Sequence, residues 1–516
     1  MVVAAARVRG FQGKDLSQNN TVAATTKHFA AYGFAESGRD YNTSDIGTNT
    51  LYNVVLPPFK ATVDAGVKSF MNSFNTLNGI PATGDAFLQR DILKGKWGFD
   101  GFVVSDWASV SEMVTHGFAQ DTAQTAEIAA NAGCDMDMES YSYLNFLAEA
   151  VRDGKVDAAK VDDAVRRILK VKFELGLFDD PYHYCSEERE KELLYHPDHA
   201  KAALDVAKRS IVLLKNENDL LPLKKDQKGI VVIGELANEK TSPLGSWRLN
   251  SDDGTAVSFL EGFKTYQEDV TYVAGPKVFI GPKSFVLNIK TNESDRTGIA
   301  EAVAAAKEAE TVVLVLGEHG FQSGEGRSRT QIDLPGLQQE LMEAVYEANK
   351  NVILVLMNGR PLALPWAAEN IPAILETWQL GTQTGNAIAE VLFGDYNPSG
   401  KLPMSFPRSV GQVPVFYNKN STGRPAPQPI VFWSHFTDES NDALFPFGYG
   451  KSYTSFDYSN LKIDASNSKA VKVSVVVKNT GSVAGEEVTQ LYLHDRHATV
   501  VRPIKELKGF QKYSLV

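Results

Sequence analysis

Four continuous apolar runs in the middle of the chain constrain its fold more than any other feature. The runs are GIVVIGEL (229–236), TVVLVLGE (311–318), NVILVLMNG (351–359) and AILETWQLG (373–381). Segments with helical periodicity lie between them, at 298–309 and 337–349. Because strands that are buried on both faces are apolar along their whole length, this block, residues 196–415, predicts a mostly parallel sheet with helices on both sides.

A similar alternation of strand and helix patterns occupies residues 1–195. Apolar or β-branched runs occur at 21–30, 67–74, 101–106 and 132–138, and helical patterns at 82–98 and 122–133. This order and spacing predict parallel β/α units. Four strands are half of the eight that close a β/α barrel, so we expect either an open sheet or one half of a barrel whose other half precedes this chain.

The C-terminal part of the chain changes character twice. Residues 416–457 are rich in Pro, Gly, Asn, Ser and aromatics, which predicts a long ordered connector. Residues 469–495 then alternate apolar and polar side chains around a turn at 479–481, as is typical of an antiparallel β-sandwich. The sequence ends at Val516 after three or four such strands, so we expect a partial sandwich over 458–516.

The composition excludes several classes of function. A chain of 516 residues has room for about two to four domains. Its formal net charge of −11 argues against nucleic acid, which requires a basic face. Two cysteines build neither a disulfide framework nor a multi-cysteine metal site; we expect Cys134 to be buried and Cys185 to be a loop thiol. No apolar stretch approaches the ~20 residues of a membrane span, and residues 1–10 lack a signal-peptide pattern, so we expect an internal start within a longer protein.

Asp106 is the first candidate for chemistry. It ends the apolar run GFVVSD and is followed by Trp107. In β/α folds ligands bind at the carboxyl ends of the strands, so a carboxylate in this position faces the site. The alternative is an Asp that caps the next helix. Trp107 favours the first interpretation, because a flat aromatic ring covers the apolar face of a sugar, although a Trp buried for packing stays open.

Two further segments carry candidate groups. Lys27 and His28 lie near the end of a predicted strand, where they could bind ligand hydroxyls or hold a carboxylate ionised; the alternative is a surface Lys and a core His. A glycine-rich loop follows the 311–318 run and contains Glu325 between two glycines. Loops on rigid sheets often carry catalytic groups, but a solvated Glu325 paired with Arg327 or Arg329 is the alternative. No phosphate-binding glycine motif follows any predicted strand.

Longer motifs extend over nearly the whole chain. In order they are KHFAAYG, NSFNTLNGIPATGD, WGFDGFVVSDW, GCDMDM, LLKNENDLLPL, LVLMNGRPLAL, LFGDYNPSGKLPMSFP and FPFGYGKSYTSF. Together they resemble glycoside hydrolase family 3, and within it the bacterial periplasmic β-glucosidases. The resemblance implies an α/β multidomain fold: the C-terminal half of a TIM-like catalytic barrel (1–195), an α/β sandwich (196–415), a connector (416–457) and a partial fibronectin type III-like β-sandwich (458–516).

The resemblance also implies roles for the candidate residues. The Asp of the family's SDW or SDH motif is the nucleophile, which corresponds here to Asp106. The general acid/base is a Glu in a loop of the sandwich domain, which corresponds to Glu325, with Glu318 as the second candidate. The positions expected to line the sugar site are Lys27, His28, Met71, Trp107 and Met138.

Some positions depart from the family pattern. Phe74 stands where many members have a Tyr whose hydroxyl lies near the nucleophile. The Asp and Arg that bind the non-reducing sugar from earlier barrel strands have no counterpart in this chain. KHFAAYG also lacks the Pro and second His of the acetylamino-sugar members, which argues against that activity.

These observations predict a retaining, exo-acting β-glycosidase, specifically a β-glucosidase. Asp106 attacks the anomeric carbon, Glu325 protonates the leaving oxygen and then activates water, and Lys27 helps to keep Asp106 ionised. The alternatives are a β-xylosidase or α-arabinofuranosidase of the same family, or a non-catalytic carbohydrate-binding fragment. We expect a β-glucoside or oligosaccharide as substrate, no metal or organic cofactor, no nucleic acid and no membrane partner. Periplasmic or secreted localisation follows from the resemblance alone, and the oligomeric state is left open, a homodimer included.

Overall fold

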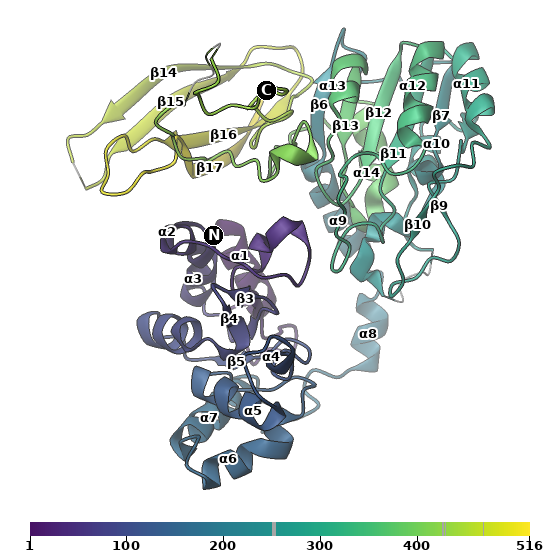
Figure 1. Cartoon of the computed structure of the whole chain (residues 1–516). Helices are drawn as coiled ribbons and strands as arrows, with labels where there is room; N and C mark the ends of the chain where they lie inside the picture. Colours follow the sequence, from purple (N-terminus) through teal and green to yellow (C-terminus); the bar gives the residue numbers. More distant parts are fainter. Residues whose placement is uncertain (250–253, 426–427, 429, 468) are drawn as a thin grey trace. The chain divides into compact units, whose positions relative to one another are not determined.

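The computed structural model describes residues 1–249, 254–425, 428, 430–467 and 469–516. The chain divides into two units, Met1–Leu194 and Tyr195–Val516, and each is described by itself (Figure 1). Among the described residues, no helix combines the length and the apolar character needed to cross a bilayer.

The first unit contains short strands and a larger number of helices. Its strands are β1 (Thr25–Phe29), β2 (Ser69–Asn72), β3 (Thr76–Leu77), β4 (Ile80–Pro81) and β5 (Phe102–Val104). Its α-helices are α1 (Val2–Gln12), α2 (Thr48–Thr50), α3 (Leu56–Asp64), α4 (Glu112–Thr115), α5 (Thr122–Ala132), α6 (Ala148–Arg152), α7 (Ala158–Glu174) and α8 (Glu187–Leu193). Wider helical turns cover η3 (Leu51–Val55), η5 (Phe87–Lys96) and η6 (Tyr143–Leu147).

The sheet of this unit is parallel, in the order β1-β2-β5. The segment 132–138, expected as a fourth strand, is not a continuous strand: it lies beside β5 with an isolated bridge between Val104 and Met136 and a few backbone hydrogen bonds, such as Met136 N–H to Val103 O at 3.1 Å. The reason lies in Asp135, whose carboxylate accepts the Val103 N–H at 2.8 Å. A neighbouring strand would bond that N–H with a backbone carbonyl, so the side chain interrupts the ladder.

One face of this sheet packs against helices. Phe70 of β2 and Val103 of β5 are fully buried in one cluster with Leu88 and Leu93 of η5. The helical pattern expected at 82–98 is therefore confirmed, and its apolar residues recur at helical spacing toward the sheet. This packing fixes β2 and β5, whose carboxyl ends carry the candidate residues.

The second unit is built on a larger sheet. Its strands are β6 (Val212–Asn216), β7 (Ile230–Ile233), β8 (Thr271–Val273), β9 (Phe279–Ile280), β10 (Lys290–Thr291), β11 (Thr311–Gly317), β12 (Val352–Met357), β13 (Ala373–Glu376), β14 (Phe456–Asp464), β15 (Lys472–Asn479), β16 (Gly485–Leu493) and β17 (Glu506–Leu515). Its helices are α9 (Pro197–Ser210), α10 (Phe259–Lys264), α11 (Ile299–Glu308), α12 (Gln338–Ala348), α13 (Pro365–Asn370) and α14 (Thr384–Leu392).

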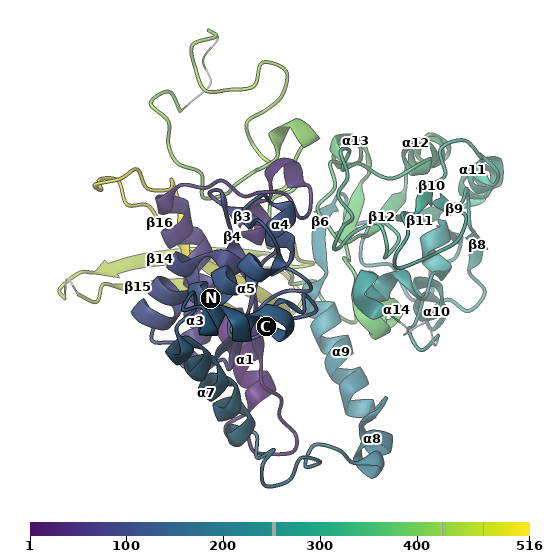
Figure 2. The same cartoon turned by 60° about the horizontal axis from the view of Figure 1, so that its bottom comes forward.

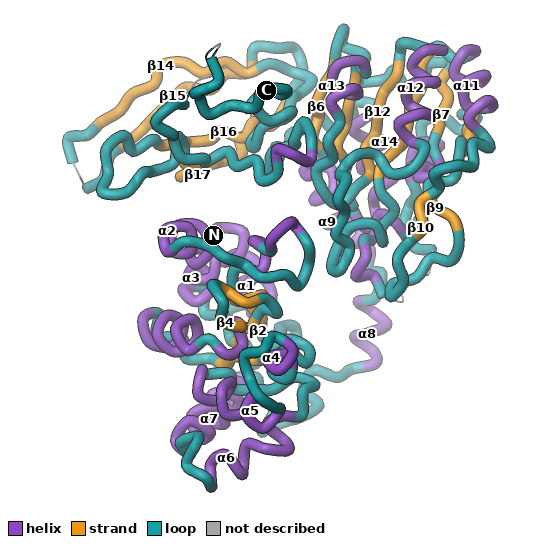
Figure 3. The backbone as a smooth tube through the Cα atoms, in the orientation of Figure 1, coloured by secondary structure: helices purple, strands orange, loops and turns teal. Residues whose placement is uncertain are grey.

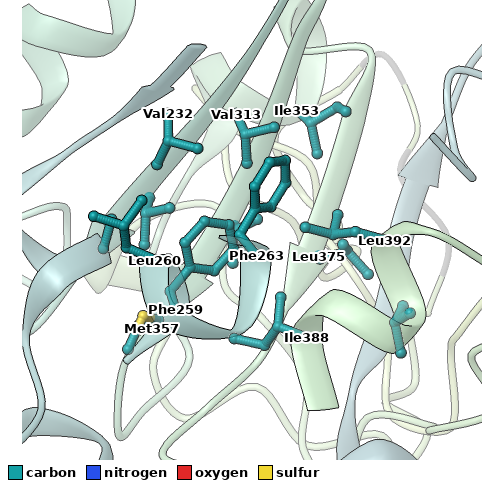
Figure 4. Close-up of a cluster of buried hydrophobic side chains, with 14 of the residues drawn as sticks. Val232, Phe259, Leu260, Phe263, Val313, Ile353, Met357, Leu375, Ile388 and Leu392 are labelled. Atoms are coloured by element: carbon teal, nitrogen blue, oxygen red, sulfur yellow. The ribbon is translucent and has the colours of Figure 1, made fainter. Parts of the chain in front are cut away.

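Six of these strands form the central sheet, in the order β6-β13-β12-β11-β7-β8. All pairs are parallel except β6 with β13. Alternate residues of β11 enter two different cores: Val313 packs with α10 and α14, and Val312 packs with α11 and α12. Figure 2 shows these helix pairs on opposite sides of the sheet, and Figure 4 shows the first core around Phe259 and Phe263. The mostly parallel, doubly covered sheet is confirmed.

The C-terminal strands form two antiparallel pairs, β14 with β15 and β16 with β17 (Figure 3). The expected alternation is present, since successive side chains of β15 are alternately exposed and half-buried. An ion pair of 2.7 Å joins Glu486 of β16 to Arg209 of α9, so these strands and the α/β sheet share contacts within one unit. The expected residue boundaries between domains stay a prediction.

Candidate active site

Asp106 follows β5 by two residues and is buried, with 7% of its surface exposed. Its Oδ1 accepts the N–H of Trp107 at 2.7 Å. It does not cap the next helix, because α4 begins after Ser111 and its N-cap has no side-chain hydrogen bond. The helix-capping alternative is therefore wrong, and the carboxylate stays at the carboxyl end of the sheet.

His28 of β1 approaches the same carboxylate. Its Nε2 lies 3.3 Å from Asp106 Oδ2, although the two residues are far apart in sequence. The parallel pairing of β1 with β2 and of β2 with β5 brings the two strand ends together. The ring edge of Tyr32 packs against His28, with ring centroids 5.2 Å apart. The sequence singled out His28 but not Tyr32, whose only signal was its place in the KHFAAYG motif.

Lys27 is the other member of the predicted pair, and its expected roles stay a prediction. It is exposed on β1, and in the described part of the chain it forms no ion pair, with Asp106 or with any other carboxylate. The register of β1 against β2 shifts between Thr26 and Phe29, so strand alternation does not decide the sides to which Lys27 and His28 point. Of the two predicted residues, His28 is the one that lies within ion-pair distance of the Asp106 carboxylate.

The other predicted sugar-site residues lie close to Asp106 in the chain or in the sheet. Met71 pairs in register with Val104 of β5 and is half-buried. Met138 is half-buried, and its N–H donates to Ser105 Oγ at 2.8 Å. Trp107 is 61% exposed, which excludes a ring buried for packing and leaves it accessible to a ligand.

Ser105 is a support that the sequence analysis missed. Its hydroxyl donates to the carbonyl of Asp106 at 2.9 Å and accepts the Met138 N–H. A second pair of bonds runs along the same two segments, from Ser105 N to Met136 O at 2.9 Å and from Ala108 N to Met138 O at 2.9 Å. The backbone that carries Asp106 is therefore tied on both sides to the segment after α5.

Burial dominates the electrostatics behind β5. Asp135 and Lys94 form an ion pair of 2.6 Å, with side chains 3% and 7% exposed. Burial raises the pKa of Asp135 and lowers the pKa of Lys94, and each partner opposes the shift of the other. Lys94 also donates to Gly133 O at 2.8 Å, so one ammonium group anchors the end of α5 and the segment beside β5. Sequence alone marks Lys94 as an ordinary helix lysine.

In the second unit, the 318–329 loop follows β11 and carries Glu325. Close packing requires two glycines, one at the end of β11 and one within the loop. A Cβ on Gly317 would lie 1.9 Å from Met357 O, and a Cβ on Gly324 would lie 2.1 Å from Ser246 Oγ; both glycines also have positive φ. Glu325 itself is half-buried. The loop is therefore packed onto its neighbours rather than extended into solvent.

Glu318 has the environment of a structural ion. Its side chain is fully buried, and its carboxylate lies 3.0 Å from Arg329 Nη1 and 3.1 Å from Arg360 Nε. Gly359 N–H also faces it, at 3.4 Å. A carboxylate held by two guanidinium groups and closed to solvent cannot reach a ligand, which argues against Glu318 as the acid. Arg329, which the alternative interpretation of the loop named with Arg327 as a partner of Glu325, forms an ion pair with Glu318.

Arginines make several further contacts with the loop. Arg327 donates from Nε to Phe321 O at 2.9 Å and from its backbone to Gly324 O at 3.1 Å, and it also reaches the carbonyl of Glu325. Arg248 lies over the ring of Phe321, 4.0 Å from its centroid. The segment around Glu325 thus has a defined local structure in which carbonyl oxygens are bound by cationic side chains.

Two domain models of glycosyl hydrolase family 3 match the chain, the N-terminal domain at residues 1–171 and the C-terminal domain at residues 211–453. A fibronectin type III-like domain matches residues 487–516. A periplasmic β-glucosidase of Salmonella typhimurium is 43% identical, over 98% of this chain and 69% of that protein. The chain belongs to glycosyl hydrolase family 3. The family inferred from the motifs is thereby confirmed.

Other members of family 3 agree with this assignment. A β-xylosidase of Formosa agariphila is 40% identical over 98% of this chain and 70% of its own length. The crystal structure of a β-glucosidase from Listeria innocua in complex with isofagomine superposes with a TM-score of 0.92 at 37% identity, covering 99% of this chain and 71% of that one. The expected combination of a TIM-like domain, an α/β sandwich and a fibronectin type III-like domain is confirmed by these matches.

Proposed function

We propose that this member of family 3 is a retaining β-glucosidase with Asp106 as nucleophile and Glu325 as general acid/base. The observation that carries the proposal is the contact of 3.3 Å between His28 and the buried carboxylate of Asp106, where two strands of a TIM-like domain end. Strand ends of this kind hold the catalytic groups of β/α barrels. The histidine also presents a ring nitrogen that can orient the carboxylate toward the sugar.

The chemistry runs in two steps. Asp106 attacks the anomeric carbon while Glu325 gives its proton to the departing glycosidic oxygen, which forms a glycosyl ester on Asp106. Glu325 then takes a proton from water as the water attacks the same carbon, and the ester bond to Asp106 breaks. Retention requires the two carboxyl groups to lie about 5–5.5 Å apart in the working enzyme.

Glu325 is preferred over Glu318 on physical grounds. A general acid must touch the leaving group and change its protonation in each cycle. Glu318 is sealed from solvent between Arg329 and Arg360. Glu325 is half-buried and lies between glycines that allow its backbone an unusual path.

The substrate is a β-glucoside or an oligosaccharide with a terminal non-reducing β-glucose, as the name of the Salmonella relative supports. The exposed ring of Trp107 offers a surface on which a sugar or aglycone ring can stack. The Formosa relative favours β-xylosidase activity as the second candidate. Periplasmic or secreted localisation is proposed on the same similarity to the Salmonella protein.

Replacement of Asp106 tests the nucleophile. Asp106→Asn should abolish turnover of aryl β-glucosides and covalent labelling by a 2-deoxy-2-fluoro glucoside, because an amide oxygen is a poor nucleophile. The assay compares this chain with a version extended upstream to the length of its relatives. Labelling that survives in Asp106→Asn contradicts the assignment, and sugar binding without turnover in both lengths favours a carbohydrate-binding protein.

Replacement of each glutamate tests the acid. Glu325→Ala should slow hydrolysis most for glucosides with poor leaving groups, since these need protonation, and azide should rescue breakdown of the intermediate. Glu318→Ala is the matched control: it should lower stability without creating azide rescue. If Glu318→Ala shows the leaving-group dependence and azide rescue, the acid has been assigned to the wrong glutamate.

A further inference from the structure

We propose that Arg360 is a positioning residue that holds the 318–329 loop closed so that Glu325 is presented to the leaving group. The inference rests on the proposed role of Glu325 and extends it to a residue on another strand. Arg360 lies three residues after the end of β12, in the NGRP segment of the chain. Its side chain is 22% exposed and reaches sideways to the neighbouring strand end, where the loop begins.

Arg360 binds the loop at three points. Its Nε lies 3.1 Å from Glu318 Oε1 at the base of the loop. Its Nη2 donates to the carbonyl of Gln322 and, at 3.0 Å, to the carbonyl of Arg327. These two carbonyls lie on either side of Glu325 in the sequence. One guanidinium group therefore joins the first residue of the loop to the backbone on both sides of Glu325, the proposed acid.

The geometry of these contacts suits arginine and no other cation. A guanidinium group is planar and offers five N–H donors in a fixed fork, whereas the ammonium group of lysine is a single point of charge. A lysine side chain is one bond shorter than the path to Arg360 Nη2 and has a single nitrogen, so a lysine that keeps its charge beside Glu318 leaves Gln322 O and Arg327 O without this donor. The substitution Arg360→Lys thus keeps the positive charge and removes the fork of N–H donors.

The backbone next to Arg360 is also fitted to the loop. A Cβ on Gly359 would lie 1.9 Å from Ser323 Oγ and 3.2 Å from Gln379 Nε2. Gln379, just after β13, donates to Ser323 Oγ at 3.2 Å. The carbonyl of Arg360 accepts a bond of 2.7 Å from Asn358 Nδ2, which fixes the start of its side chain. The segments after β12 and β13 therefore pack rigidly against the loop. Arg360 is the residue that reaches from them to the loop carbonyls on both sides of Glu325.

A loop held in this way loses little entropy when the leaving group arrives. General acid catalysis needs the proton donor within hydrogen-bond reach of the oxygen, and a displacement of about 1 Å can cost roughly 10²-fold in rate. Loss of the Arg360 fork should therefore affect the steps that use Glu325 and leave attack by Asp106 nearly unchanged.

The test is the dependence of kcat/KM on the leaving group in Arg360→Lys. With phenyl β-glucoside, which needs protonation, kcat/KM should fall about 10²-fold. With 2,4-dinitrophenyl β-glucoside, whose leaving group departs without a proton, it should stay within a few-fold of the unmodified protein. An equal loss on both substrates, or no loss on either, overturns the inference.

Two companion variants separate this inference from the proposed function. Arg329→Lys is the matched control, because it makes the same change on the same Glu318 carboxylate without touching Gln322 or Arg327. It should leave the leaving-group dependence as it is. If Glu325→Ala itself shows no leaving-group dependence, the proposed function fails; if it does and Arg360→Lys does not, only the inference fails. In the Glu325→Ala background, Arg360→Lys should add no further loss.

Amide hydrogen exchange supplies a readout that needs no turnover. In Arg360→Lys, the amides of residues 322–328 should exchange at least tenfold faster than in the unmodified protein, while those of β11 and β12 keep their rates. In Arg329→Lys they should stay protected. Unchanged exchange of residues 322–328 in Arg360→Lys contradicts the proposed role of Arg360, whatever the kinetics show.

Discussion

The buried ion pair behind β5 predicts a large and pH-dependent loss of stability when Lys94 is replaced by Met. Asp135 is then left at a site where its side chain is 3% exposed, and among the described residues the Val103 N–H is its remaining hydrogen-bond donor. Gly133 O loses its partner as well. Because these groups tie α5 to β5, the effect should appear in the strand that leads to Asp106.

The magnitude follows from the charge that is left behind. Removal of one partner of a buried ion pair costs about 3–5 kcal/mol. Asp135 can also lose its charge by taking up a proton. This protonation costs about 1.4 kcal/mol for each pH unit above its ordinary pKa of 3.8. At pH 7 this limits the charge-related cost to about 4 kcal/mol. Since the pKa of Asp135 is raised in the folded state, the cost grows as pH rises from 3.8 and is small near pH 4.

Native-state hydrogen exchange at Val103 and Val104 is the suitable assay, because a chain of two units need not unfold in a single transition. At pH 7 these amides should exchange about 10²–10³-fold faster in Lys94→Met. The control Lys94→Met/Asp135→Asn carries no buried charge and should recover much of the protection. An increase below threefold in the single variant, or faster exchange in the double variant than in Lys94→Met, refutes the reasoning.

Three further predictions concern packing, thiol reactivity and acid stability. Gly317→Ala should destabilise the second unit by several kcal/mol in thermal unfolding, because the new Cβ would lie 1.9 Å from Met357 O; a melting temperature within one degree contradicts the contact. Burial raises the pKa of Cys134 to about 12, so the folded chain should titrate one thiol, Cys185, and two after denaturation; two fast thiols in the folded chain contradict this. Burial alone would raise the pKa of Glu486, but hydrogen bonds from Tyr396 and Arg209 lower it to about 2. The amides of β16 should therefore exchange faster in Glu486→Gln than in the unmodified protein. This difference should be constant above about pH 4.5 and vanish as pH falls through about 2. A difference that grows on acidification contradicts the lowered pKa.

The α/β sheet could be predicted because nearly every residue of its main strands is apolar. β7, β11, β12 and β13 are buried along their whole length and are apolar almost throughout, with Glu376 at the end of β13, and such runs fit strands that are covered on both faces. The fourth strand of the first unit was predicted wrongly for a local reason. Asp135 bonds the neighbouring backbone with its side chain, and hydropathy patterns do not contain that competition.

The candidate site was predictable in part. Asp106 could be found because a carboxylate ends an apolar run, and its identity as a candidate did not depend on tertiary structure. The contact of His28 with Asp106 depends on the pairing of β1 with β2 and of β2 with β5, which the residues of β1 alone do not reveal. Arg360 was invisible for a different reason: its role arises from two strand ends that meet only in the folded sheet.

The central claim is that Asp106 forms the covalent bond to the sugar. Reaction with a 2-deoxy-2-fluoro-β-glucosyl donor, followed by peptic digestion and peptide mass spectrometry, tests it most directly in the protein extended to the length of its relatives. We expect one fluoroglucosyl group per chain, attached to Asp106 in the peptide that contains GFVVSDW. A label on any other carboxylate, Glu325 and Glu318 included, would contradict the account.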